Sequence, residues 1–262
     1  MQCPVVILCG GFGARIHEET EQKPKPMVEI GNKPILWHIM KTYAQYNFKD
    51  FILCLGYKGE VIKNYFLNYS ALNRDFTVKL GKRDVHFLND SPESDWEVTL
   101  ADTGLEAMTG ARIKRIEKYI DTDDFMVTYG DGVADINIDE LVSFHQSHGK
   151  IGTVTGVHYL SRFGEMVVDD RKVAKFAEKP WTYGHEGIIN GGFFVFKKDF
   201  FKYLWNGDDC TLEKEPLENL AADGELMVYH HKGFWQCLDT FREKQLLNEL
   251  WDSGQARWRV WT

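Results

Sequence analysis

The chain has 262 residues, of which 44% are hydrophobic and 27% are charged. These fractions are typical of a globular protein with a sizeable core, and they exclude fibrous and intrinsically disordered classes. The formal net charge of −8 opposes binding to nucleic acid and to anionic membrane surfaces. An anionic ligand would therefore need a local cluster of cations.

The five cysteines are odd in number and contain no Cys-x-x-Cys pair. We interpret them as reduced thiols of a cytoplasmic protein rather than as disulfides or a metal site. No apolar stretch reaches the roughly 18 residues that a membrane span requires. We therefore expect neither a membrane nor a nucleic acid as a partner.

The first part of the chain alternates between strand and helix patterns. Apolar runs predict strands over residues 5–9 and 51–55, and helical spacing of apolar residues predicts helices over residues 34–46 and 60–69. This β-loop-α-β-α order is typical of a parallel sheet.

The next interval, residues 73–102, is less regular and predicts an excursion from the sheet. Its strand candidates are residues 76–80, 85–88 and 98–101. Thr109 then offers an N-cap for a helix over residues 109–119.

Strand candidates dominate the second half, and no linker or repeat separates it from the first. The expected strands are 124–129, 151–158, 165–169, 173–178, 191–196 and 227–230, and the expected helices are 139–148, 199–205, 212–222 and 240–251. The order predicts one α/β domain over residues 1–262, with a Rossmann-like, mixed but mainly parallel sheet flanked by helices and a smaller β-rich excursion. We expect the basic and aromatic end, residues 256–261, to pack against the body or a neighbouring subunit.

A glycine loop follows the first strand and is followed by cations. Gly10, Gly11 and Gly13 let backbone amides approach a ligand closely, and Arg15, Lys23 and Lys25 follow, which indicates phosphate binding. The dinucleotide fingerprint fails because Ile16 occupies the third glycine position and no acidic residue ends the second strand. A Walker A loop is absent from the sequence.

Two aspartates are candidate Mg²⁺ ligands. Asp131 lies between two glycines at the end of a predicted strand, and Asp239 follows an aromatic run just before a predicted helix. Two carboxylates suit Mg²⁺, which takes its other ligands from phosphates and water. A glycine turn at Asp131 and a helix cap at Asp239 are the alternatives.

A polar pocket suited to a sugar is the third candidate site. Its residues would come from the Arg162-Phe163-Gly164 turn, from Lys179 and from Asn190 beside Gly191. A solvated lysine and a tight glycine turn are the alternatives.

These motifs, in this order, resemble the sugar-1-phosphate nucleotidylyltransferases over nearly the whole chain. Longer blocks, such as residues 33–40 and 128–135 and Gly233-Phe234-Trp235-Gln236, are similar to the glucose-1-phosphate cytidylyltransferase branch. The resemblance implies the nucleotide-diphospho-sugar transferase fold, with a nucleotide-binding part over about residues 1–135 and a sugar-binding and C-terminal part over about 136–262. It also implies a homo-oligomer, with a hexamer as the expected assembly.

The resemblance assigns roles residue by residue. It implies that Lys25, Arg15 and Asp131 are catalytic and that Asp131 and Asp239 hold Mg²⁺. The implied nucleotide contacts are Leu8, Cys9, Gly10, Gly11, Phe12, Gly13, Ala14, Arg15, Lys25, Arg112 and Gly130, and the implied sugar-phosphate contacts are Arg162, Gly164, Glu178, Lys179, Asn190 and Gly191.

Four positions depart from the family's usual pattern. Cys9, Ala14 and Ile16 replace the family's alanine, threonine and leucine in the loop, and Ala107 replaces a serine found in a relative. The phosphate loop therefore lacks one hydroxyl group, which we interpret as tuning of affinity.

The resemblance implies a reaction between CTP and α-D-glucose 1-phosphate that yields CDP-glucose and pyrophosphate. The attacking phosphate oxygen is already ionised, so positioning and charge neutralisation suffice without a general base. Use of another sugar 1-phosphate, or of UTP or dTTP, is the alternative within the class. A non-catalytic nucleotide-sugar sensor or regulatory subunit is the alternative from a different class.

Overall fold

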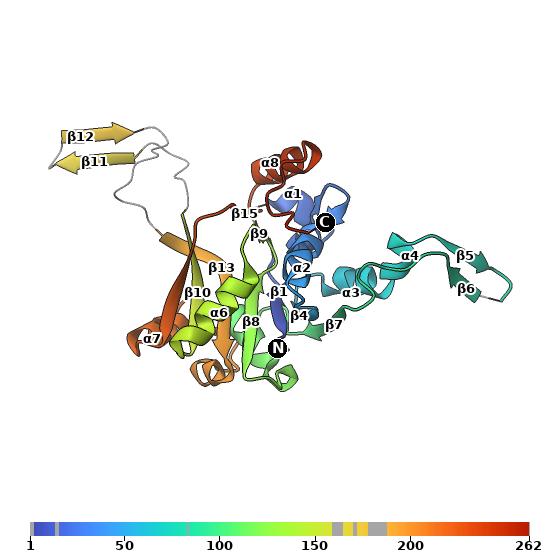
Figure 1. Ribbon diagram of the computed structural model, residues 1–262, viewed down its shortest axis with the longest axis horizontal. Coiled ribbons are helices and arrows are strands. Elements are labelled where there is room, and N and C mark those ends of the chain that lie inside the picture. The colour runs from blue at the N-terminus through green and yellow to red at the C-terminus, as the bar shows by residue number, and fades with distance from the viewer. Residues whose placement is uncertain are drawn as a thin grey trace.

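A seven-stranded sheet forms the centre of the protein (Figure 1). The computed structural model describes residues 3–13, 16–82, 84–158, 165–169, 172–177 and 188–261. In spatial order the strands are β14 (Leu226–His231), β10 (Gly152–His158), β13 (Ile188–Lys197), β8 (Asp124–Tyr129), β1 (Val5–Leu8), β4 (Asp50–Leu55) and β7 (Glu97–Asp102). Within this sheet β13 runs antiparallel to its two neighbours and the other pairs are parallel, which confirms the expected mixed, mainly parallel sheet.

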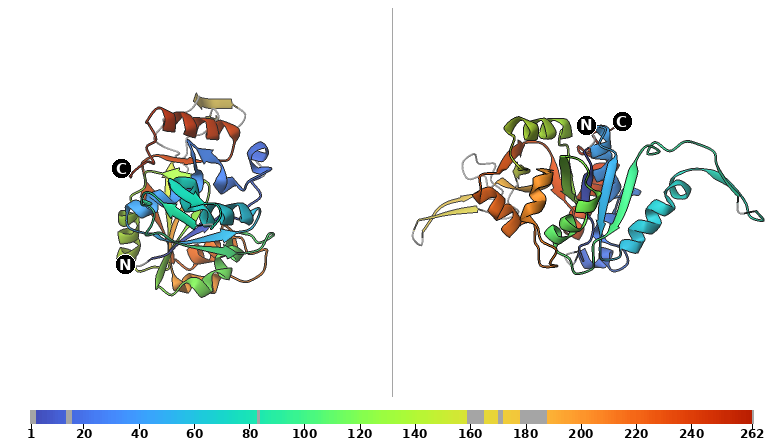
Figure 2. Two further views of the ribbon diagram at one scale, coloured as in Figure 1. Left: turned by 90° about the vertical axis from the view of Figure 1, so that its right-hand side faces the viewer. Right: turned by 90° about the horizontal axis from the view of Figure 1, so that it is seen from below.

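Helices cover both faces of the sheet, as Figure 2 shows from two sides. Successive side chains of a strand point to opposite faces. Because helices cover both faces, every residue of β1 is buried. Val5 and Ile7 belong to the core with α2 (Ile35–Gln45), α3 (Gly59–Leu67) and α6 (Ile138–His148). Val6 and Leu8 belong to a second core, and its helical elements are α5 (Thr109–Arg115), η4 (Lys198–Tyr203) and α7 (Glu215–Ala222).

An arm leaves the body between α3 and β7 (Figure 1). It contains α4 (Tyr69–Asn73) and a hairpin of β5 (Phe76–Lys79) and β6 (Asp84–Phe87), which confirms the expected excursion from the sheet. The prediction that residues 98–101 belong to this excursion was wrong. They form most of β7, because their backbone pairs in parallel with β4 at the sheet edge.

A second hairpin joins β11 (Glu165–Asp169) to β12 (Lys172–Ala177) in a separate two-stranded sheet. Two further short strand pairs, β2–β3 and β9–β15, and several helical turns complete the described elements. They are α1 (His17–Thr20), η2 (Lys25–Met27), β2 (Glu29–Ile30), β3 (Lys33–Pro34), β9 (Gly132–Ala134) and β15 (Trp235–Cys237), and α8 (Phe241–Asp252) follows them.

Some predicted boundaries were wrong at helix ends. Thr109 is the first residue of α5 rather than its cap, because Met108 occupies the cap position and the Thr109 hydroxyl bonds elsewhere. The helix expected over residues 109–119 ends at Arg115 and continues as the 3₁₀ turn η3 (Glu117–Tyr119). Residue 178, at the end of a predicted strand, lies outside the described residues.

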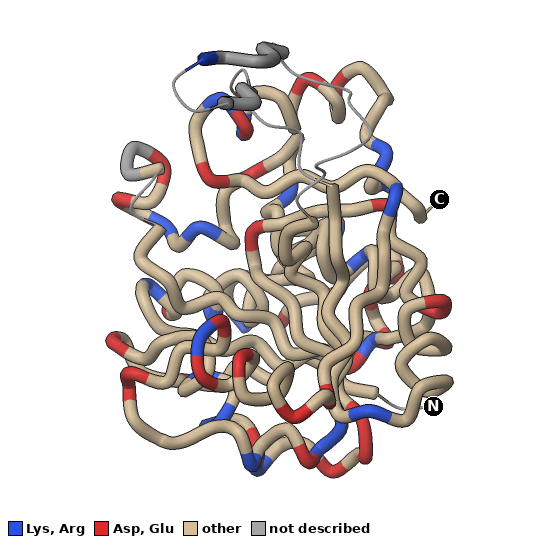
Figure 3. The backbone as a smooth tube through the Cα atoms, turned by 90° about the vertical axis from the view of Figure 1, so that its left-hand side faces the viewer, with Lys and Arg blue, Asp and Glu red and all other residues tan. Residues whose placement is uncertain are grey.

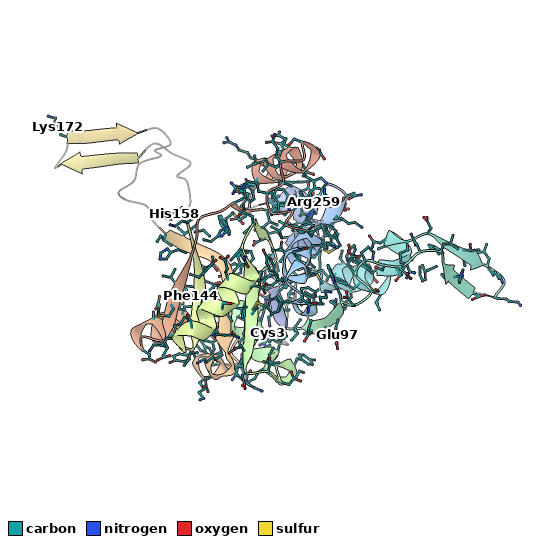
Figure 4. The ribbon with its side chains drawn as sticks, in the orientation of Figure 1. Cys3, Glu97, Phe144, His158, Lys172 and Arg259 are labelled. Atoms are coloured by element: carbon teal, nitrogen blue, oxygen red, sulfur yellow. The ribbon has the colours of Figure 1, made fainter. Side chains whose placement is uncertain are left out.

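The C-terminal segment packs against the body, as expected. Trp258 is fully buried, and its indole N–H lies 3.4 Å from Nδ1 of His38. The Arg259 guanidinium, labelled in Figure 4, lies 5.5 Å from the ring centre of Trp251 in α8. This contact gives the basic residue a structural partner within the chain.

Acidic and basic positions are interspersed along the described backbone (Figure 3). Within the described part of the chain, no helix is both long enough and apolar enough to cross a bilayer.

Candidate functional site

The candidate site lies where β1 and β8 end side by side. Leu8 is paired with Tyr129 in the parallel register, and the amide of Gly130 donates to the carbonyl of Leu8 at 3.1 Å. Two chain segments that are more than a hundred residues apart therefore leave the same edge of the sheet together. In open α/β sheets, this edge is where ligands bind.

A cavity of about 490 Å³ opens at this edge. The glycine loop forms one wall, the segment before α5 forms a second, and the end of β8 forms a third. Its lining residues are Leu8, Cys9, Gly10, Gly11, Phe12, Gly13, Lys25, Pro26, Leu105, Glu106, Ala107, Met108, Thr109, Arg112, Tyr129, Gly130 and Asp131. Most of the nucleotide contacts expected from the sequence thus surround one cavity.

Arg112 lies behind the glycine loop, and its side chain is buried. Its guanidinium donates to the carbonyl oxygens of Gly10 at 3.0 Å, Leu55 at 3.1 Å and Gly104 at 2.7 Å. A Cβ atom on Gly10 would lie 2.2 Å from this guanidinium, so a larger residue does not fit there. Arg112 therefore ties the glycine loop to the segment that begins at Gly104.

Lys25 bridges the two aspartates of the site. Its ammonium donates to Asp131 at 2.6 Å and also to Asp239. Burial alone would lower the pKa of Lys25, but the two carboxylates outweigh burial and raise it. Lys25 is therefore a fixed positive charge at neutral pH.

The start of α8 holds Asp239 in place. Thr240 is the N-cap and forms a capping box with Glu243. The Glu243 carboxylate accepts from the amides of Asp239 and Thr240 at 2.8 and 2.7 Å. Because Thr240 caps the helix, the Asp239 carboxylate is left to face Lys25.

The two aspartates fit Mg²⁺ by their chemistry. Because Asp131 and Asp239 both contact one ammonium group, their carboxylates converge on a small region, and carboxylate oxygens are the ligands that Mg²⁺ prefers. Among the described residues no three His, Cys, Asp or Glu side chains gather as a metal cluster. Such a pair suits an ion that takes its remaining ligands from substrate phosphates and water.

A second cavity, of about 320 Å³, adjoins the first. Both cavities are lined by Tyr129 and Asp131. The other residues of the second cavity are Thr128, Gly132, Asn190, Gly191, Gly192, Phe193, Glu213, Trp235, Cys237 and Asp239. Asn190 and Gly191, which the sequence predicted as sugar-phosphate contacts, lie in this cavity.

Six predicted site residues lie outside the part of the chain that the structure describes. They are Ala14, Arg15, Arg162, Gly164, Glu178 and Lys179. Their predicted roles stay predictions.

Sequence reasoning missed several residues that line the two cavities, including Leu105, Met108, Tyr129, Glu213 and Trp235. Tyr129 could have been found because it directly precedes Gly130 and Asp131. Glu213 lies in a segment with no motif, so nothing in the sequence signals it.

The chain is similar in sequence to known nucleotidyl transferases. A family model described as nucleotidyl transferase matches residues 4–242. The chain is 49% identical over 259 residues to a glucose-1-phosphate cytidylyltransferase of Salmonella typhi, covering 98% of both chains. It is 46% identical to a protein of Bacillus subtilis (strain 168) named probable glucose-1-phosphate cytidylyltransferase, covering 98% of this chain and 99% of that one.

The fold also has solved counterparts. A UDP-glucose pyrophosphorylase solved with UDP-glucose superposes with a TM-score of 0.68, covering 97% of this chain and 100% of that chain at 15% identity. At that identity the likeness concerns the fold alone. The family match over most of the chain, together with a relative at 49% identity, shows that the chain belongs to the nucleotidyl transferase family.

Proposed function

We propose that the protein transfers a cytidylyl group from CTP to α-D-glucose 1-phosphate, giving CDP-glucose and pyrophosphate. The observation that supports this proposal is that two cavities meet at Asp131, beside Lys25 and Asp239. Transfer between two anions needs adjacent binding sites with charge-neutralising groups at their junction. The names of the relatives in Salmonella typhi and Bacillus subtilis support the choice of substrates.

We assign the nucleotide to the first cavity and the sugar phosphate to the second. The amides of Gly10 to Gly13, with Arg15, would hold the triphosphate, and Lys25 would stabilise the charge that develops at the α-phosphate. Lys179 would hold the sugar phosphate. We further propose that residues 1–262 form one domain, with the nucleotide-binding part over about residues 1–135 and the sugar-binding and C-terminal part over about 136–262.

We propose Mg²⁺ as the cofactor and Asp131 and Asp239 as its protein ligands. Mg²⁺ bound there would neutralise phosphate oxygens of both reactants. Lys25 contacts the same two carboxylates and would supply a second positive charge beside the phosphates. Removal of Mg²⁺ with EDTA should abolish turnover, and added Mg²⁺ should restore it.

A substrate panel tests the proposed reaction. Purified protein is incubated with CTP, UTP or dTTP, each with glucose 1-phosphate or another sugar 1-phosphate, and pyrophosphate release is measured. We expect the highest kcat/KM with CTP and glucose 1-phosphate. A preference for UTP would contradict the cytidylyl assignment, and CTP binding without turnover would favour a non-catalytic sensor.

We also propose that the protein is a homo-oligomer, with a hexamer as the expected state. The arm supports this proposal, since Phe76, Leu80 and Leu88 are 41%, 84% and 61% exposed and an apolar surface of this kind is typical of an interface. Figure 4 shows the side chains of β5 and β6 projecting from the arm at a distance from the central sheet.

All five cysteines are free thiols, which supports a cytoplasmic location.

Light scattering coupled to size-exclusion chromatography tests the oligomeric state. We expect a mass several times that of one chain. The double variant Phe76→Ser, Leu80→Ser should elute at a lower mass, while the control Lys79→Ser on the same hairpin should not. A single-chain mass for the unmodified protein would contradict the proposal.

A further inference from the structure

Glu213 joins the two cavities through a chain of hydrogen bonds. Its Oε2 accepts from the Thr109 hydroxyl at 2.7 Å, and its Oε1 accepts from the Tyr129 hydroxyl at 2.5 Å. Thr109 lines the first cavity, Glu213 lines the second, and Tyr129 lines both. One carboxylate therefore connects the start of α5 to the end of the strand that precedes Asp131.

The chain of hydrogen bonds continues to Asn190. The Asn190 side-chain amide donates from Nδ2 to the Tyr129 oxygen at 3.2 Å, and its Oδ1 accepts from the amide of Gly192 at 2.8 Å. Both carboxylate oxygens of Glu213 accept, Oε2 from Thr109 and Oε1 from Tyr129, so the Tyr129 hydroxyl donates to Glu213. The Tyr129 oxygen is then left to accept from Asn190, which fixes which end of the amide is Nδ2.

Two further features favour this arrangement of hydrogen bonds. Burial, and secondarily the negative charge of Glu213, raise the pKa of Tyr129, so its hydroxyl remains a donor at neutral pH. Gly192 has a φ of +79°, and a Cβ atom there would lie 2.5 Å from the Tyr129 ring. The glycine thus allows its amide to face Asn190 while its backbone packs on Tyr129.

The start of α5 also fixes the position of Glu213. The Thr109 hydroxyl that donates to Glu213 also accepts from the amide of Leu212 at 2.9 Å. This double contact holds the turn before α7 against the first residue of α5. Glu213 is therefore anchored on one side and free to direct Tyr129 on the other.

We propose that Glu213 is a positioning residue for sugar recognition: acting through Tyr129, it orients the Asn190 amide so that an N–H of Nδ2 is offered to a hydroxyl group of the sugar phosphate. Within the described hydrogen bonds, Nδ2 uses one of its two hydrogens on Tyr129, and the second remains for a ligand. This inference rests on the proposed function, because that function assigns the sugar phosphate to the second cavity.

The experiment compares glucose 1-phosphate with its 2-, 3-, 4- and 6-deoxy analogues at saturating CTP. In the unmodified protein, the analogue that lacks the hydroxyl contacted by Asn190 should have a lower kcat/KM than glucose 1-phosphate. In Asn190→Ala this difference should disappear for that analogue, which identifies the hydroxyl. We expect Glu213→Ala to raise the KM for glucose 1-phosphate about tenfold, with a smaller change in kcat, and to reduce the discrimination against that same analogue.

Two further variants separate positioning from a general loss of structure. Tyr129→Phe keeps the ring but removes the link, so we expect it to reproduce the effect of Glu213→Ala, and the double variant should add little to either. Glu213→Gln, which keeps an oxygen acceptor for Tyr129, should restore part of the discrimination. Glu218→Ala removes an exposed carboxylate of the same segment and should behave as the unmodified protein.

Distinct outcomes separate the two proposals. Absence of turnover by the unmodified protein with CTP and glucose 1-phosphate would contradict the proposed function. Unchanged discrimination among the deoxy analogues in Glu213→Ala, with an active unmodified protein, would contradict this inference alone. Strictly additive effects of Glu213→Ala and Tyr129→Phe would also contradict it.

Discussion

Lys25 lies between two carboxylates, and this position explains why it differs from its neighbour Lys23. Its side chain is 13% exposed and contacts both Asp131 and Asp239. Lys23 is more exposed and contacts Glu29 at 3.6 Å, outside the two cavities. The two lysines are separated by one residue but have different surroundings.

We expect Lys25→Ala to lower kcat on the order of 10²–10³-fold, because one preorganised charge at the reacting phosphate is lost. Lys23→Ala is the matched control and should change kcat little. Pyrophosphate release at saturating CTP, glucose 1-phosphate and Mg²⁺ measures both. If the Lys25 variant stayed within about threefold of the unmodified protein, the role given to Lys25 would be wrong.

Arg112 acts on the loop rather than from within it, as its contacts with Gly10 and Gly104 indicate. We expect Arg112→Lys to reduce the free energy of unfolding by about 2–3 kcal/mol, since one ammonium cannot replace a guanidinium that bonds several buried carbonyl groups. The KM for CTP should rise as the loop loses its support. Denaturant unfolding and steady-state kinetics measure the two effects.

The control for Arg112 is Arg115→Lys in the same helix. Arg115 contacts Asp208 at 2.6 Å and donates to the carbonyl oxygen of Thr103 at 2.6 Å, but it is more exposed and bonds fewer carbonyl groups than Arg112, so we expect a smaller loss of stability in Arg115→Lys. Equal losses of stability in the two variants would argue against a special role for Arg112.

At the scale of elements, the start of α8 and the end of β8 bring the aspartates together. The capping box of Thr240 and Glu243 fixes the first turn of α8, and Asp239 directly precedes it. We expect Thr240→Ala to lower the free energy of unfolding by about 1 kcal/mol, as the loss of a cap does elsewhere. It should also raise the Mg²⁺ concentration that gives half-maximal activity.

Asn137→Ala is the matched control, because Asn137 caps α6 by accepting from the amide of Glu140 and lines neither cavity. A similar loss of stability without a change in Mg²⁺ requirement is expected. If both variants had the same effect on the Mg²⁺ requirement, the cap of α8 would have no particular link to Asp239.

At the scale of the whole molecule, the buried His38 couples stability to pH. Burial lowers the pKa of His38 from 6.5 to about 4, and its ring lies between the carbonyl of Ile30 and the indole of Trp258. The unfolded chain therefore binds this proton at a higher pH than the folded protein does. The contribution that the neutral, buried His38 makes to the free energy of unfolding is fully present above pH 6.5 and is lost as the pH falls from 6.5 toward 4.

We expect the free energy of unfolding to fall by up to about 3 kcal/mol over this range on account of His38. Denaturant unfolding at a series of pH values measures the slope, and His38→Gln should flatten it. Burial also lowers the pKa of His145 to about 4, so His145→Gln provides a comparison at a second buried histidine. An unchanged slope in His38→Gln would show that His38 does not titrate in this way.

Much of the fold follows from local sequence patterns. The strands β1, β4 and β8 are continuous apolar runs, a pattern typical of strands covered on both faces of a sheet. The helices between them have apolar residues at helical spacing. The glycine loop and Gly130-Asp131-Gly132 can also be recognised from short stretches of sequence. Helix ends were predicted less well, because side-chain partners from distant segments decide them, as Glu213 does for Thr109.

By itself the sequence determined the class of fold, the phosphate-binding loop and the candidate aspartates, because short-range periodicity and residue chemistry encode them. Only the tertiary structure decided which of these groups meet. Lys25 contacts Asp239 across 214 residues of sequence, and Glu213 contacts Thr109 across 104. Such contacts depend on strand register and on helix packing over the whole sheet, and no local pattern contains that information.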